Sequence, residues 1–219
     1  VLHDTVPIPP EPEYVDLGLS VKWATFNVGA SKPEDYGDYF AWGETEPKEE
    51  YSWTNYKWCD GTQNNMTKYN TTDGKTILDP KDDAATVNWG DKWRMPTDEE
   101  FTELREKCTW IWTTLNDVNG YEITGSNGHS IFIPAAGFYY ENGFNWNKNG
   151  DYWSTRANLP NSGNHLNFYP DKRIESTSLR YSGFPIRPVY SETPDPCLVV
   201  NVNDTLSINM MCVEGGTFM

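Results

Sequence analysis

One stretch of the sequence has the residue spacing of a divalent-cation site. Asn145, Asn147 and Asn149 stand two residues apart and Gly150 follows, as in the first half of an EF-hand calcium loop. All three are neutral amides, however, and the twelfth position of the loop is Arg156 instead of a glutamate. The four cysteines form no C-x-x-C pair that would indicate zinc. The sequence therefore predicts no metal site and no cofactor.

Residues that could carry out acid–base or nucleophilic chemistry are few and isolated. His3, His129 and His165 stand near no serine or cysteine nucleophile motif, and neither G-x-S-x-G nor H-E-x-x-H occurs. The acidic pairs Asp82-Asp83 and Glu99-Glu100 are explained as charges at the start of a helix. In a glycosidase, two carboxylates face each other across a cleft and can be far apart in the sequence. A glycosidase therefore stays open as an alternative. We predict that the protein is not an enzyme.

Residues 139–173 have the composition of a recognition surface. Eight asparagines lie in this stretch, with tyrosine, serine, histidine and aspartate among them. His165, Asn167 and Tyr169 occupy alternate positions of one short run, which predicts a strand whose polar side chains face solvent. Adaptable polar side chains combined with flat rings are typical of antibody paratopes.

The apolar residues of the same run, Leu166 and Phe168, are expected to face the core. Because asparagine is favoured in turns, an ordinary set of Asn-rich loops is the alternative interpretation of this stretch. The residues predicted to contact a ligand are Asn145, Asn147, Asn149, Asn158, Asn161, Asn164, His165, Asn167, Tyr169, Asp171 and Arg173.

Two helices are predicted ahead of this stretch. A short one covers about residues 81–88. For the second, Thr97 and Glu100 have the spacing of a capping box, in which each satisfies the other's backbone N–H. Phe101 and Leu104 then follow at helical spacing, and the helix is expected to end near Cys108, a small buried apolar residue.

The remaining elements are predicted to be short strands and packed loops. Residues 15–23 alternate between apolar and polar side chains, which is the period of a half-buried strand. Further strand-like runs cover residues 110–114, 121–124, 130–134, 152–154, 165–169 and 186–190. Residues 32–75 are read as loops held by the rings of Tyr39, Trp42, Trp53, Tyr56 and Trp58. Helices followed by short strands predict an α+β fold.

The net charge and the distribution of apolar residues limit the classes of partner that the protein can bind. The 219 residues carry a formal net charge of −15, which makes nucleic acid and anionic membranes poor partners, and no apolar run is long enough to cross a bilayer. A monomer is expected. Proline-rich residues 1–12 predict a linker, residues 13–190 one domain, residues 191–197 a second linker, and residues 198–219 the first strands of a following domain that is truncated here.

Several motifs resemble those of one family. They are W-R-M-P-T at 93–97 followed by E-E-F, G-D-Y-W-S at 150–154 and G-F-P-I-R-P-V at 183–189. This set resembles the Fibrobacter major paralogous domain family. The resemblance implies a C-type-lectin-like fold, in which a small twisted antiparallel sheet and two helices support long surface loops. Within these motifs, we interpret Arg94, Trp153 and Arg187 as structural residues, since a buried aromatic residue usually serves packing, and Arg187 is expected to pair with a carboxylate.

Two further resemblances concern parts of the chain. The tail V-N-V-N-D-T-L-S-I-N-M-M-C-V-E-G-G-T-F-M is similar to the start of a formylglycine-generating, sulfatase-modifying-type domain. Residues 139–173 are placed like the variable region of proteins that retroelements diversify. The protein is thus expected to be a binding module, and this placement is typical of a diversified variable protein or its paralogue. We expect it to be secreted or anchored on the outer surface of a Gram-negative bacterium, where it recognises a protein or a glycan. The alternatives are an accessory domain of a larger enzyme and a structural or adhesive unit.

Overall fold

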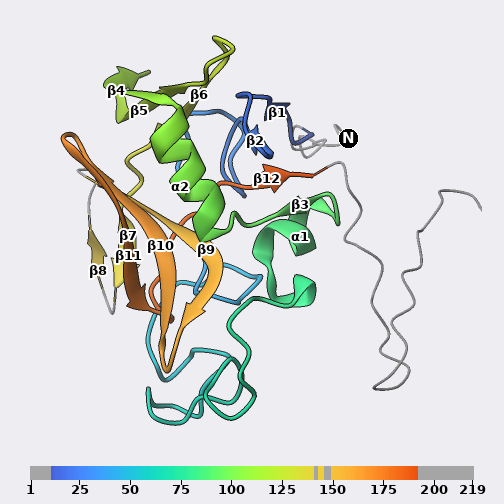
Figure 1. The fold of residues 1–219 in the computed structure, drawn as a ribbon. Coiled ribbons are helices and arrows are strands. Elements are labelled where there is room, and N and C mark those ends of the chain that lie inside the picture. The colour runs from blue at the N-terminus through green and yellow to red at the C-terminus, as the bar shows by residue number, and fades with distance from the viewer. Residues whose placement is uncertain (1–10, 141–142, 146–148, 192–219) are drawn as a thin grey trace, which may run out of the picture.

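The computed structural model describes residues 11–140, 143–145 and 149–191 (Figure 1). Most of the predicted first linker, nearly all of the second and the predicted strands of a following domain lie outside these residues. The described part is a mixed α+β structure with few helices and mostly antiparallel sheets, as the sequence predicts at this coarse level.

Helix α2 (Asp98–Lys107) begins and ends where its local sequence predicts. The Thr97 side chain accepts a hydrogen bond from the Glu100 N–H, and the Glu100 side chain accepts one from the Thr97 N–H, so the capping box is confirmed. Leu104 is buried on the face that points to the core. Cys108 is the C-cap residue and packs partly buried against the main core cluster.

The predicted helix at 81–88 is divided in two. A 3₁₀ turn, η1 (Pro80–Asp82), precedes α1 (Ala84–Trp89). Asp83 separates them because its backbone is extended and its carboxylate accepts the Thr86 N–H at 3.1 Å. An N-cap residue of this kind lies outside the helix that it starts.

The chain enters and leaves the domain in one four-stranded sheet. Its order is β1 (Tyr14–Val15), β2 (Lys22–Ala24), β12 (Val189–Tyr190) and β3 (Trp93–Arg94). The predicted continuous strand at 15–23 is wrong in its middle, because the chain turns at Gly18, whose φ is 75°. The Asp16 carboxylate stabilises this turn by accepting the Gly18 N–H at 2.7 Å.

Two three-stranded antiparallel sheets form the rest. The first has the order β4 (Thr109–Leu115), β5 (Val118–Thr124), β6 (Ser130–Pro134). The second has the order β11 (Lys172–Leu179), β10 (Ser162–Tyr169), β9 (Gly150–Asn158). A hairpin of β7 (Phe138–Tyr140) and β8 (Gly143–Asn145) precedes β9. The predictions missed β11, whose sequence K-R-I-E-S-T-S-L lacks a continuous apolar face.

The core lies on both faces of the second sheet. On one face, where α2 packs, Leu166 and Phe168 join a buried cluster that includes Trp23 (Figure 1). On the other face, Trp153 belongs to a second cluster with Trp42. Trp153 is therefore core, as predicted.

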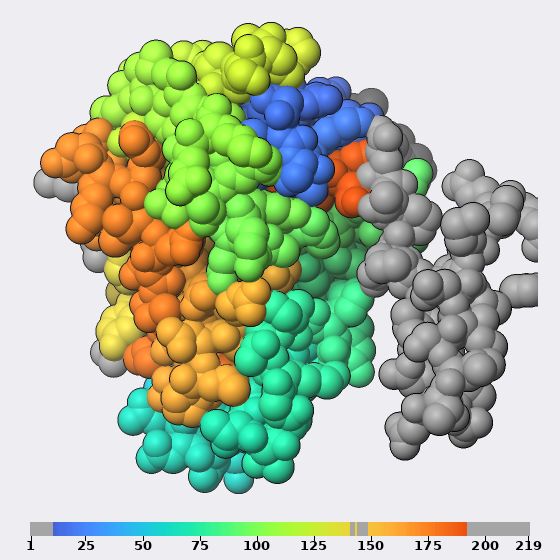
Figure 2. Space-filling model, viewed as in Figure 1, coloured from blue at the N-terminus to red at the C-terminus, as the bar shows by residue number. Residues whose placement is uncertain are grey.

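Residues 25–79, all of which are described, contain no helix or strand, only isolated bridges, and ring donors hold them in place. The Trp42 indole donates to the Ser154 carbonyl at 2.9 Å, and the Trp58 indole donates to the Gly43 carbonyl at 2.6 Å. The Tyr56 hydroxyl donates to the Trp42 carbonyl at 2.7 Å. The predicted packed loops are thus confirmed. Part of this segment gathers at one end of the molecule, opposite the β4–β5–β6 sheet (Figure 2).

Arg187 is fully buried, but its partners differ from the predicted carboxylate. Its Nε donates to the Asn27 side-chain oxygen at 2.8 Å, and one terminal nitrogen donates to the Ala24 carbonyl at 3.0 Å. Burial lowers the pKa of Arg187 to about 10, which still leaves the guanidinium charged at neutral pH. It ties the segment before β12 to the end of β2 and to the loop that follows β2, so its role is structural.

Candidate ligand-binding site

The polar side chains predicted to face solvent from β10 do not form an exposed face. His165 is only 5% exposed and Asn167 only 7%, so the predicted orientation is wrong for both. The physical reason is that β10 is the middle strand of its sheet and is covered on both faces. The His165 ring lies edge-on to Phe184 and Trp153, with centroids 4.9 and 5.7 Å away. Tyr169, by contrast, is 42% exposed, as predicted.

These buried side chains meet at one carboxylate. Asp151 accepts the Asn167 side-chain N–H at 2.8 Å, and the same oxygen lies 3.1 Å from His165 Nε2. Its second oxygen accepts a hydrogen bond from the Asn149 side chain. All four residues are buried. Three of the residues predicted to bind ligand are therefore internal partners of Asp151, which the sequence analysis did not single out.

This network fixes the base of the β7–β8 hairpin. The Asn149 carbonyl accepts the Gly137 N–H at 2.9 Å, which joins the two ends of the segment that contains the hairpin. Tyr139 is then paired with Gly183 through two backbone hydrogen bonds of 2.9 Å. The Asp151 network thus supports the strand that carries Tyr139 and Tyr140.

The other predicted contact residues are distributed over separate places. Asn164 donates to Asp98 at 2.7 Å, and the Arg173 guanidinium lies over the rings of Trp110 and Tyr121 at 5.5 and 5.4 Å. Exposed Asn158 and half-buried Asn161 flank the start of β10, and exposed Tyr169 and Asp171 flank its end. Asn145 is the last residue of β8, and Asn147 lies outside the described residues. These residues do not surround one site.

A more coherent site is a hollow walled by tyrosines, which we call the tyrosine pocket. It has a volume of about 340 Å³. Its walls come from the loop after β2 and from β7. The lining residues are Gly37, Asp38, Tyr39, Pro47, Lys48, Glu49, Tyr51 and Tyr139.

The three rings of the tyrosine pocket are held rigidly. Tyr139 meets Tyr39 edge-on at 4.9 Å and stacks on Tyr51 at 5.4 Å. The Tyr39 hydroxyl donates to the Ala136 carbonyl, and the Tyr51 hydroxyl donates to the Tyr39 carbonyl, both at 2.6 Å. The Tyr51 ring also lies so close to Gly183 that a Cβ there would be 2.6 Å from it. Burial raises the pKa of the Tyr39 and Tyr51 hydroxyls, so both stay protonated donors.

More rings continue the surface beside the pocket. Tyr140 is 41% exposed and lies 5.5 Å from Tyr181, and Trp53 meets Tyr181 edge-on at 4.9 Å. From the sequence, Trp53 is expected among the loop anchors and Tyr139 at the start of the recognition stretch. Nothing in their spacing showed that they lie near each other.

The carboxylates of the pocket are available as acceptors. No described residue donates a hydrogen bond to Asp38 or Glu49 through its side chain or backbone, whereas the Lys48 ammonium is paired with Glu44 at 2.7 Å. Partial burial raises the pKa of Asp38, as expected for a carboxylate that loses solvation without gaining a hydrogen-bond donor or a positive charge. The pocket therefore combines aromatic rings with two solvent-exposed carboxylates that no described residue pairs, so a ligand hydroxyl competes there only with water.

The described cysteines do not have the properties of catalytic nucleophiles. Burial raises the pKa of both Cys59 and Cys108, whereas a reactive thiol needs a lowered pKa. In the described ranges, no group of three or more histidine, cysteine, aspartate or glutamate side chains could hold a metal ion. No helix in the same ranges is long and apolar enough to span a membrane.

Among the described carboxyl groups, Asp83 has the properties nearest to those of a general acid. It lines a cavity of about 480 Å³ beside Arg94, and burial raises its pKa to about 6. Its two oxygens, however, accept the backbone N–H groups of Thr86 and Met95 at 3.1 and 2.9 Å, and Arg94 is paired with Glu100. These contacts give Asp83 a structural role at the start of α1.

The pKa of Asp83 predicts a pH-dependent contribution to stability. A carboxyl whose pKa rises on folding stabilises the folded state most when protonated, so this contribution is lost as pH increases from about 4 to 6. The stability advantage of the parent over Asp83→Asn should therefore shrink by about 2 kcal/mol between pH 4.5 and 7.5. Urea unfolding of both proteins at the two pH values measures it. A constant difference would contradict the raised pKa.

Comparison with known proteins adds no relative: no protein-family model, no curated protein and no solved structure matches this chain.

Proposed function

We propose that this protein is a non-catalytic binding module that recognises a neutral glycan through the tyrosine pocket. The observation that carries the proposal is a hollow of about 340 Å³ in which the part-exposed rings of Tyr39 and Tyr139, backed by the buried ring of Tyr51, lie beside two carboxylates that no described residue pairs. That volume is at the lower end of the range for ligand pockets, roughly 300–1,000 Å³, and suits one or two sugar units.

The chemistry of a sugar fits such walls. One face of a pyranose presents C–H groups, which pack on the electron-rich face of an aromatic ring. Its hydroxyl groups are donors that Asp38 and Glu49 can accept. The net charge of −15 and these two carboxylates disfavour sugars that carry phosphate, sulfate or carboxylate.

The proposal includes fold and location. The α+β architecture, with long loops held on small sheets, and the motifs W-R-M-P-T and G-F-P-I-R-P-V support a C-type-lectin-like fold. The same motif resemblance supports a secreted or outer-surface protein of a Gram-negative bacterium. A protein ligand, which the sequence analysis treats as equal to a glycan, becomes the competing outcome of the experiment.

The test is a glycan array followed by calorimetry with the best ligand. We expect binding to neutral glycans and a loss of affinity of at least about tenfold in Tyr139→Ala, because tyrosines are frequent hot spots of binding. Asp38→Asn should also weaken binding, since the amide nitrogen replaces an acceptor. The matched control is Tyr169→Ala, an exposed tyrosine at the far end of β10, which should bind like the parent.

Two results would contradict the proposal. One is full affinity in Tyr139→Ala together with a loss in Tyr169→Ala, which would return the site to the residues predicted around β10. The other is an array without binding while a surface protein is captured by the parent chain, which would favour a protein ligand.

A further inference from the structure

Strand β4 has an open edge. It is the end strand of the β4–β5–β6 sheet, and in the described ranges no backbone hydrogen bond joins it to anything except β5. Alternate residues of an end strand point their N–H and C=O groups away from the sheet. Its sequence, T-W-I-W-T-T-L, contains seven residues without a charge, glycine or proline.

Proteins usually protect such edges with charged residues, prolines or very short strands. The end strand of the other three-stranded sheet, β11, follows this rule, because Lys172, Arg173 and Glu175 lie along it. The end strand β1 has only two residues. Of these end strands, β4 is the one without any of these protections.

The two faces of β4 differ. Trp110 and Trp112 point inward, each 5.1 Å from the Tyr121 ring, and hold the strand on the core. On the outer face Ile111 is 53% exposed, and Thr113 lies two residues further along. The solvent side of β4 is therefore apolar and threonine-rich.

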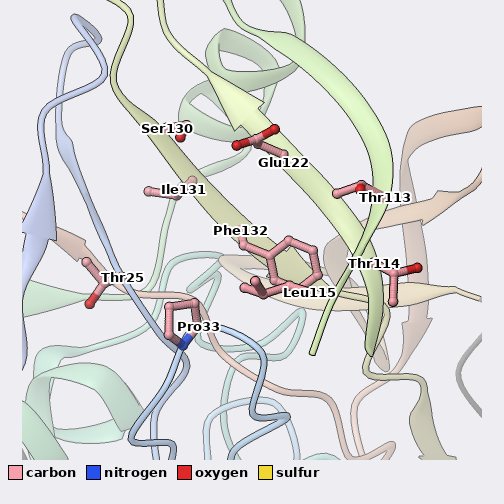
Figure 3. A pocket seen from close by; sticks show the side chains of 9 residues that line it. All are labelled: Thr25, Pro33, Thr113, Thr114, Leu115, Glu122, Ser130, Ile131 and Phe132. Atoms are coloured by element: carbon pink, nitrogen blue, oxygen red, sulfur yellow. The ribbon is translucent and has the colours of Figure 1, made fainter. Parts of the chain in front are cut away.

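A groove of about 310 Å³ adjoins this outer face. Figure 3 shows Leu115 of β4 and Phe132 of β6 close together at its centre, with Pro33 from the loop opposite them. Thr113 and Glu122 also line the groove. It therefore offers an apolar wall next to the open edge.

We infer that β4 is the site at which two copies of this chain associate, by antiparallel pairing of β4 with β4. In a pairing centred on Trp112, Ile111 of each copy lies opposite Thr113 of the other. All paired residues are then uncharged β-formers, so cross-strand packing is favourable and no charge repulsion arises along the pair, despite the net charge of −15.

The result is a continuous sheet of six strands, in which hydrogen bonds between the two β4 backbones replace their hydrogen bonds to water. A second copy is favoured as the occupant because it supplies a strand of the same length and the same lack of charge. This inference departs from the monomer expected from the sequence, and it uses none of the residues of the tyrosine pocket.

The experiment is sedimentation velocity of the whole chain from roughly 5 to 500 µM, a range over which association by mass action is visible. We expect a monomer–dimer equilibrium for the parent. Ile111→Lys should sediment as a monomer throughout, because a lysine on an edge strand opposes pairing. The control is Thr177→Lys on the exposed side of β11, which should dimerise like the parent.

A second measurement does not depend on any variant. Hydrogen exchange of the parent should slow by about tenfold or more at peptides covering β4 when the concentration rises through the same range. A monomeric parent at all concentrations, or a dimer that persists in Ile111→Lys, would overturn the inference. So would a dimer in which exchange at β4 is unchanged.

Discussion

Asp151→Ala is expected to lower the free energy of unfolding by roughly 3–5 kcal/mol, the cost of removing one partner from a buried polar network. The carboxylate accepts hydrogen bonds from Asn149 and Asn167 and contacts His165, and all three of these residues are buried. Each donor left unpaired in the interior adds about 1–3 kcal/mol of desolvation cost.

Urea unfolding followed by tryptophan fluorescence measures this loss. Asp171→Ala is the matched control, because this aspartate is exposed and its removal should change stability by less than about 0.5 kcal/mol. Asp151→Asn should lie between the two, since it keeps one acceptor and turns the other into a donor. A loss below about 1 kcal/mol in Asp151→Ala would show that the network does not stabilise the fold.

Phe168→Ala is expected to cost a similar amount, roughly 3–5 kcal/mol, for an apolar reason. The ring stacks on Tyr152 at 5.9 Å and meets Tyr121 edge-on at 5.4 Å. It also covers Gly150 so closely that a Cβ there would lie 2.1 Å from the ring. Removing it leaves a cavity between rings that are held by their own contacts and cannot close.

The neighbouring Tyr169→Ala is the control for this substitution. Its side chain is on the exposed side of the same strand end, so the cost should stay within about 0.5 kcal/mol. A cost below about 1.5 kcal/mol for Phe168→Ala would mean that the surrounding rings do close the cavity. The prediction would then be wrong about the rigidity of this core.

The elements predicted best are those determined by neighbours in the sequence. The start of α2 depends on Thr97 and Glu100, three residues apart, and each satisfies the other without help from the rest of the fold. The inward positions of Leu166 and Phe168 follow from alternation alone. Such signals are complete within one segment, so the sequence contains all that is needed.

The wrong prediction that His165 and Asn167 of β10 face solvent has the opposite origin, because it depends on contacts with residues distant in the sequence. Alternation separates the two faces of a strand, but it does not say whether a second layer covers the polar face. Phe184 and Trp153 cover it here, and Asp151 supplies the acceptor that makes the burial of His165 and Asn167 tolerable. From the sequence, replacing these two polar residues would be predicted to cost little stability. The structure predicts a substantial loss.

The tyrosine pocket could not have been assembled from spacing. Tyr39 and Tyr51 belong to a loop without periodicity, and Tyr139 belongs to a strand of three residues. They meet because Tyr139 pairs with Gly183, and that pairing brings β7 to the loop. A contact of this kind is a property of the tertiary fold alone.

The loops of residues 32–75 are held by hydrogen bonds from a few aromatic side chains and not by a continuous series of strand-to-strand hydrogen bonds. This affects how such a protein can evolve. Where Trp42, Trp58 and Tyr56 donate to carbonyls, the path of the chain is determined. Between these anchors, doubling the length of a segment costs only about 0.6 kcal/mol of closure entropy. Insertions and exchanges there can produce new outer surfaces in descendants of this gene, while the anchoring rings keep the frame unchanged.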